Sequence, residues 1–217
     1  MYFYDIHTHS IPSNEDVVSI LNHNVGESGS FCGLNLQHQL YSIGLHPWKI
    51  RENNLSQSID FIEKNAIFDA VKSIGECGLD KACETPWHLQ EKAFTAQIKI
   101  SESIQKPLII HCVKAFDELI ALKREIKPHQ TWIIHGFRGK PEQANQLVKQ
   151  GFFFSFGPIY NEESLSLIPQ DRFFLETDHS GKTIESVYQK AAVTLGLDIE
   201  LLGSILENNL KRTFIRQ

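Results

Sequence analysis

Short apolar runs recur along the chain, and segments with a helical pattern of apolar residues separate them. Most runs are apolar at consecutive positions, which is typical of strands buried on both faces of a parallel sheet. Seven runs predict strands, and Phe31–Leu36 is a weaker eighth candidate. The seven runs are Tyr2–Ile6, Leu40–Leu45, Val71–Gly75, Pro107–Ile110, Thr131–Ile134, Phe152–Phe156 and Arg172–Leu175.

Amphipathic segments predict helices between these strands. Leu89, Ala93 and Ala96 begin one apolar helical face, and Asp198 is a potential N-cap. The predicted helices are Pro86–Gln105, the segment with Phe116, Leu119 and Ile120, Pro141–Gln150, Ile184–Leu195 and Asp198–Phe214. Strands that alternate with helices indicate a parallel α/β fold, and a doubly wound sheet and a closed barrel both fit the pattern.

Composition narrows the class of protein. The 217 residues include 41% hydrophobic residues, and 21 basic against 26 acidic residues give a net charge of −5. These values exclude a disordered chain and argue against a protein that grips long nucleic acid by bulk charge. No apolar run is long enough to span a membrane, and the N-terminus lacks a signal-peptide pattern. We therefore expect one domain over residues 1–217, in the cytoplasm, with no obligate protein partner.

Imidazoles and carboxylates follow the predicted strands. In a parallel barrel the C-terminal strand ends meet on one face, where active sites are built. These residues are His7, His9, His46, Glu76, His111, His135, Glu176 and Asp178. A lone His-x-His pair such as His7 and His9 is weak, and a buried His or Glu can have a purely structural role. The joint pattern, however, predicts a site for divalent cations, because neutral imidazoles and carboxylates are their usual ligands.

The sequence resembles the TatD-type metal-dependent deoxyribonucleases of the amidohydrolase superfamily. The resemblance spans nearly the whole chain. The matching segments are Asp5–His9, Gly44–Pro47, Ile74–Asp80, His111–Cys112, His135–Phe137, Glu176–Asp178 and Asn208–Phe214, together with Gln90, Phe94 and Gln97.

This resemblance implies a distorted, compact TIM-type (β/α)8 barrel with one or two divalent ions (Zn, Mg or Mn). His7, His9 and Asp178 would bind one cation, His111 and His135 a second, and Glu76 would serve both. It also implies that a metal-activated hydroxide cleaves a phosphoester bond, with Glu76 and Asp178 as catalytic residues. DNA is one candidate substrate, and a 3'-5' exonuclease one candidate activity.

Departures from the family pattern concern the substrate. Val113 stands where the family has Arg, Arg138 replaces a Ser, and His179 replaces a small residue after Glu-Thr-Asp. The predicted substrate contacts are His46, which looks like a substrate-side residue of the family, and Lys114, Arg138 and His179. A solvated loop position is the alternative for Arg138, and support of a ligand or simple exposure is the alternative for His179. For His46 the alternative is a hydrogen bond that fixes its loop. The rim loops before Leu40 and after Asp178 are shortened, which makes the transfer of DNA as substrate an open question.

Other functions compete with a phosphodiesterase of this type. A metal-dependent amidohydrolase or lactonase, or a small-molecule phosphoesterase, can use the same scaffold and the same nucleophile. A phosphatase of the polymerase-and-histidinol-phosphatase type also starts with His-x-His, but Ser10-Ile11-Pro12 lacks its next ligand. A binding module without catalysis would keep the barrel and the metal and turn over no substrate.

Overall fold

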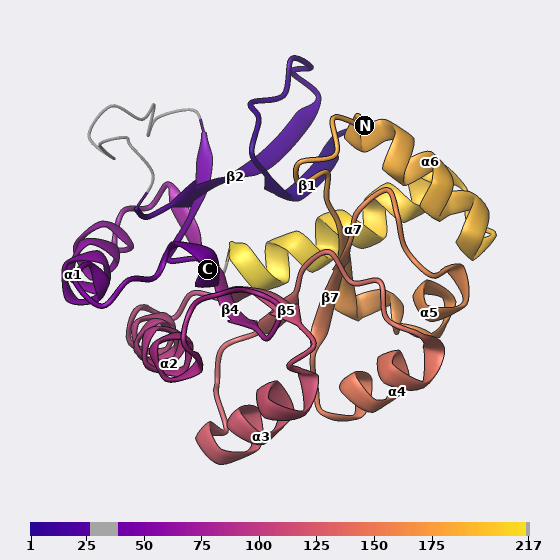
Figure 1. Cartoon of the computed structure of the whole chain (residues 1–217). Coiled ribbons are helices and arrows are strands. Elements are labelled where there is room, and N and C mark those ends of the chain that lie inside the picture. The colour runs from indigo at the N-terminus through magenta and orange to yellow at the C-terminus, as the bar shows by residue number, and fades with distance from the viewer. Residues whose placement is uncertain (27–38, 216–217) are drawn as a thin grey trace. The chain divides into compact units, whose positions relative to one another are not determined.

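Eight strands form one sheet over residues 1–26 and 39–215, the part of the chain that this computed structural model describes, and a described helix follows each strand from the third onward (Figure 1). The strands are β1 (Phe3–Thr8), β2 (Val17–Asn24), β3 (Leu40–Gly44), β4 (Val71–Asp80), β5 (Leu108–Val113), β6 (Trp132–Ile134), β7 (Phe153–Phe156) and β8 (Phe173–Leu175). The helices are α1 (Leu55–Asn65), α2 (Trp87–Ile104), α3 (Phe116–Ile126), α4 (Pro141–Lys149), α5 (Glu162–Leu167), α6 (Ile184–Leu195) and α7 (Ile199–Phe214). Two 3-10 helices are η2 (Pro47–Lys49) and η3 (Gln170–Arg172). The strand order is the chain order, and each described strand pairing is parallel.

The chain divides into two compact units, and each is described by itself. Unit 1 comprises residues 1–21 and 133–217, and unit 2 comprises residues 22–132. The single domain over residues 1–217 stays a prediction. In the described part of the chain, no helix has both the length and the apolar character needed to cross a bilayer.

Unit 1 brings the two ends of the chain together through β1. Strand β1 pairs with β2 on one side, and Thr8 forms a parallel bridge with Asp178 just beyond β8. Helices α6 and α7 both pack on β1, and α7 also packs on β8 (Figure 1). The core is rich in Phe, with Phe154, Phe156 and Phe173 fully buried. This packing places the ends of β1 and β8 side by side.

Unit 2 is built around β4, which pairs with β3 and β5. Helix α2 packs on β4, and α1 packs on α2. Gln97 of α2 reaches the turn after β3, where its side chain accepts a hydrogen bond from Leu45 N (2.8 Å) and donates one to Leu45 O (3.2 Å). The buried ring of Phe94 packs against that of Trp132, with a distance of 5.7 Å between the ring centroids. These contacts fix the C-terminal end of β3 against α2 and pack α2 against Trp132 of β6.

Seven predicted strands are confirmed, but three of them continue beyond their predicted ends, and the first, β1, runs to Thr8 and so includes His7. Strand β4 runs to Asp80 and β5 to Val113, so Glu76 and His111 lie inside strands and not after them. The eighth strand is β2, which the apolar pattern did not reveal, and Phe31–Leu36 lies outside the described residues. Helices α1 and α5 were also not predicted.

Gly78 allows β4 and β5 to approach each other closely. It pairs with His111, has a φ of +146°, and a Cβ there would lie 2.0 Å from the carbonyl oxygen of His111. Only glycine meets both the conformational and the steric requirement at this position. The Gly-Glu-x-Gly-Leu-Asp segment therefore sets the distance between the backbones that carry Glu76 and His111.

Gly78→Ala is expected to lower the free energy of unfolding by about 3 kcal/mol or more, because two backbones must separate to admit the methyl group. Urea unfolding measures the change. Gly151→Ala is the matched control, since Gly151 has a φ of +74° but nothing within 4 Å of the added Cβ. The control should cost about 1–2 kcal/mol from backbone strain alone. Equal losses in the two variants would contradict the steric argument.

Candidate metal centre

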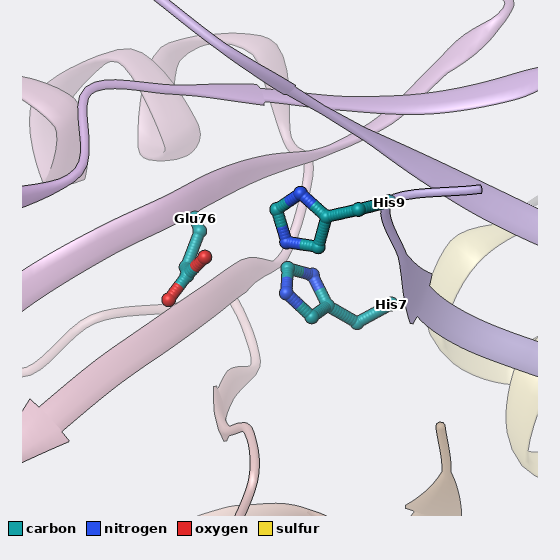
Figure 2. Close-up of side chains that lie close together, drawn as sticks. All are labelled: His7, His9 and Glu76. Atoms are coloured by element: carbon teal, nitrogen blue, oxygen red, sulfur yellow. The ribbon is translucent and has the colours of Figure 1, made fainter. Parts of the chain in front are cut away.

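Unit 1 gathers two imidazoles beside one carboxylate at the end of β1. The Nε2 atoms of His7 and His9 lie 3.6 Å and 3.4 Å from the same oxygen, Oδ1 of Asp178. Figure 2 shows the rings of His7, on β1, and of His9, just beyond the end of β1, and it also labels Glu76 of unit 2. The i,i+2 spacing of the two His residues places both rings beside Asp178.

The electrostatics of Asp178 follow from these neighbours. Burial alone would raise the pKa of this carboxyl, but the adjacent imidazoles of His7 and His9 hold the pKa well below its ordinary range. Asp178 also adopts a positive φ of 51°, and its N–H donates to the carbonyl of His7 (2.9 Å). The carboxylate is therefore ionised at neutral pH and held against β1 by the backbone.

Asp5 ties β1 to the Glu-Thr-Asp segment. Its Oδ1 accepts hydrogen bonds from Thr177 N (3.1 Å) and His7 N (3.3 Å), and its Oδ2 accepts one from Thr177 Oγ1 (2.6 Å). Burial raises the pKa of Asp5 to about 7, although the bonds from Thr177 oppose the shift. These bonds fix the backbone on either side of His7 and Asp178.

A second carboxylate orients His135. Its Nδ1 lies 3.2 Å from Oε1 of Glu176, which is fully buried, and its ring centroid lies 4.4 Å from that of His7. This contact directs Nδ1 at Glu176, so Nε2 is the nitrogen that can act as a ligand. The exposed His179 stacks on His9 at 3.4 Å, and its ligand atom falls within 4.8 Å of those of His9 and Asp178.

Unit 2 holds a second group of two imidazoles and one carboxylate, and this group is centred on Glu76. Oε1 of Glu76 lies 3.1 Å from His46 Nε2 and 3.0 Å from His111 Nδ1, and all three side chains are largely buried. Asn22 of β2 fixes the strand here, because its Oδ1 accepts a hydrogen bond from Glu76 N (2.9 Å). His46 also shows the loop-fixing bond considered for it, since its Nδ1 accepts from Trp48 N and caps η2. The ligand atoms of His46, Glu76 and His111 lie within 4.8 Å of one another.

Asp80 is a site residue that was not predicted. Its Oδ2 lies 3.0 Å from His111 Nε2 and accepts a 2.7 Å hydrogen bond from Trp48 Nε1, while Oδ1 accepts one from Ala82 N. Burial would raise the pKa of Asp80, but the bonds from His111, Trp48 and Ala82 lower it below its ordinary value. An ionised Asp80 thus accepts a hydrogen bond from Nε2–H of His111 and leaves Nδ1, on the Glu76 side, as the ligand nitrogen.

Asp80→Asn is expected to weaken metal binding about 10- to 100-fold, because the amide no longer fixes the tautomer of His111. Titration of the metal-free protein with Zn²⁺ measures the affinity, and ¹⁵N shifts of His111 report the tautomer. Asp60→Asn on the exposed side of α1 is the control. If the tautomer of His111 changes but the Zn²⁺ affinity does not, the orientation of His111 by Asp80 does not contribute to metal binding, and the prediction is wrong.

Two predicted substrate contacts are exposed. Lys114 follows β5 with a φ of +53°, and Arg138 follows His135 by three residues. Two thiols lie next to proposed ligands in the sequence: burial raises the pKa of Cys112 to about 12 and that of Cys77 further still. Neither thiol is thus a thiolate at neutral pH.

The donor chemistry of both groups fits a divalent cation. Each combines imidazole nitrogens with a carboxylate oxygen that the surroundings keep charged or hydrogen-bonded, a mixture suited to Zn²⁺ or Mn²⁺. A buried carboxylate such as Glu76 or Glu176 also costs free energy unless a partner offsets its charge.

Lowering the pH from 7.5 to 5 is expected to weaken metal binding at least about 100-fold, because two imidazoles per group must lose protons to bind. Dialysis at each pH followed by metal analysis measures the loss. Metal retention that stays constant down to pH 5 would contradict a site dominated by imidazoles.

The chain is similar to proteins described as metal-dependent hydrolases. It is 30% identical to the uncharacterized metal-dependent hydrolase YabD of Bacillus subtilis, over 80% of this chain and 76% of YabD. It is 28% identical to the 3'-5' ssDNA/RNA exonuclease TatD of Dickeya dadantii, over 88% of this chain and 83% of that protein.

Solved structures agree on the fold. YJJV, a TatD homologue from Escherichia coli K12, superposes with a TM-score of 0.81 at 21% identity, covering 99% of this chain and 98% of YJJV. This similarity confirms the predicted TIM-type barrel.

The profile of the TatD related DNase family matches residues 33–215, which include Glu76, His111, His135 and Asp178, while His7 and His9 precede the matched range. The chain therefore belongs to the TatD related DNase family of metal-dependent hydrolases.

Proposed function

We propose that this chain is a metal-dependent phosphoesterase that acts on the ends of single-stranded nucleic acid. The observation that carries the proposal is the pairing, in each unit, of two imidazoles with one carboxylate oxygen: His7 and His9 with Asp178, and His46 and His111 with Glu76. The relative from Dickeya dadantii, named as an exonuclease, supports this substrate class.

In this proposal the ligands are His7, His9 and Asp178 in unit 1, and Glu76 and His111 in unit 2. His135 and His46 stand beside them as additional imidazoles. When bound, a divalent cation lowers the pKa of water and offsets the charge of phosphoryl oxygens. The sharing of Glu76 between two cations stays a prediction.

The protein's own residues supply orientation and proton handling. Asp178, ionised at neutral pH, accepts a hydrogen bond from the attacking water and aligns it. Asp80 and Glu176 hold His111 and His135 in one tautomer each, so that no ligand nitrogen must lose a proton during turnover. The exposed Lys114 and Arg138 are the cationic side chains proposed to contact the phosphate backbone, the Arg being able to do so with two hydrogen bonds.

A substrate panel tests the proposal. Protein loaded with Zn²⁺, Mn²⁺ or Mg²⁺ is given 5'-labelled single-stranded DNA, an aryl phosphodiester, an aryl phosphomonoester, an amide and a lactone. We expect stepwise shortening of the DNA and cleavage of the diester, both lost in His111→Ala. Turnover of only the amide or the lactone would favour an amidohydrolase, and metal binding without any turnover would favour a binding module.

A further inference from the structure

Unit 2 contains a cleft beside its histidine cluster, and Trp48 forms one wall. The cleft has a volume of about 730 Å³, within the range of small-molecule sites. It lies between the segment after β3, which includes Trp48, and the segment that links β4 to α2. Asp80, which orients His111, also lines it. The cleft therefore adjoins the histidine cluster through Trp48 and Asp80.

Trp48 has an unusual position for so large a ring. Its side chain is 56% exposed, yet the indole Nε1–H is held by a 2.7 Å hydrogen bond to the buried Asp80. The ring lies edge-on to His46 and His111, with centroid distances of 4.9 Å and 5.8 Å. An exposed aromatic face that is fixed in orientation is ready to stack on a flat partner without further loss of side-chain freedom.

The charges along the cleft favour an uncharged partner. Three carboxylates, Glu52, Asp80 and Glu84, line it together with one cation, Arg51, whose guanidinium donates to the carbonyls of Trp48 and Ile50 (2.9 Å and 2.7 Å). Carboxylates repel a phosphate but can accept hydrogen bonds from ring and amino N–H groups. The apolar side chains of Leu89 and Val113 complete the lining.

We propose that this cleft binds the nucleobase next to the scissile phosphate, stacked on Trp48. The inference rests on the proposed phosphoesterase function and specifies its substrate as a nucleoside ester. Stacking on an aromatic side chain is tolerant of base identity and contributes about 5- to 150-fold in affinity per base. Trp48 then determines specificity, while its N–H bond to Asp80 also helps to position His111.

Two substrates with the same leaving group test the inference in the metal-loaded enzyme: the 4-nitrophenyl phosphodiesters of deoxyadenosine and of methanol. Trp48→Leu should lower the ratio of their kcat/KM values by about 5- to 150-fold. Trp48→Phe keeps a ring but loses the bond to Asp80, so both esters should slow together and the ratio should stay within about 3-fold. An unchanged ratio in Trp48→Leu would overturn the inference.

A binding measurement does not depend on turnover. Deoxyadenosine should quench the tryptophan fluorescence of the metal-free protein, and the quenching should disappear in Trp48→Phe but persist in Trp87→Phe, whose ring does not line this cleft. Quenching that survives in Trp48→Phe, or displacement of deoxyadenosine by inorganic phosphate, would overturn the inference. If neither ester is hydrolysed, the proposed function fails, and the fluorescence still decides the occupant of the cleft.

Discussion

Glu76→Gln is expected to lower kcat/KM for a phosphodiester by about 1000-fold or more while the fold is retained. The carboxylate oxygen that lies 3.1 Å from His46 and 3.0 Å from His111 becomes part of a neutral amide of the same size. A cation then loses a charged ligand, and the several kcal/mol that it contributes to stabilising the transition state are lost with it. Steady-state kinetics and metal analysis of the same preparations measure both effects.

The control for this substitution is Glu91→Gln, on an exposed position of α2. It removes the same charge from the same unit without touching the histidine cluster, so activity and metal content should match the wild type. Urea unfolding of Glu76→Gln should remain within about 1 kcal/mol of wild type, since the amide keeps the volume of the side chain. Full activity in Glu76→Gln would refute both the ligand role of Glu76 and the proposed function.

Runs of buried residues predicted the strands well where the strand has no polar function. Strands β6, β7 and β8 consist of Trp, Phe, Ile, Leu and one Ser, and their predicted limits agree with the observed ones to within one residue. Strand β2 was missed because Ser19, Asn22 and Asn24 interrupt its apolar residues. Asn22 is buried because its side chain holds Ser42 and the backbone of Glu76, so its polarity serves the site.

For the site, too, the sequence pattern predicted some residues and missed others. Residues whose type alone indicates metal chemistry, such as His7 and His111, were predicted from their position near strand ends. Asp80 and Glu176 act through hydrogen bonds to His111 and His135, and that role depends on side-chain geometry. One signal was available for Asp80: it ends the Gly-Glu-x-Gly-Leu-Asp segment at even spacing from Glu76, which in a strand places both side chains on the same face.

Asp178→Asn is the second substitution with a large expected effect. It removes the carboxylate oxygen that His7 and His9 both approach, so we expect a loss of about 1000-fold in kcat/KM and a lower metal content. The amide keeps the bond from Asp178 N to the carbonyl of His7, which is a backbone bond, and the local fold should therefore persist. Asp171→Asn, at an exposed position of unit 1, is the control and should behave as wild type.

The pH profile distinguishes a direct role of Asp178 from a general weakening of the site. Its neighbours keep the pKa of this carboxyl well below the ordinary range, so it stays ionised throughout the pH range in which the enzyme can bind metal. Its own protonation therefore cannot cause the loss of activity on acidification, which belongs to the imidazoles. In a plot of log kcat/KM against pH, Asp178→Asn should accordingly lower the plateau. The decrease in activity at acidic pH, the acidic limb of the profile, should remain. Disappearance of that limb in the variant would show that Asp178 itself titrates during catalysis and would contradict its assignment as a permanently charged ligand.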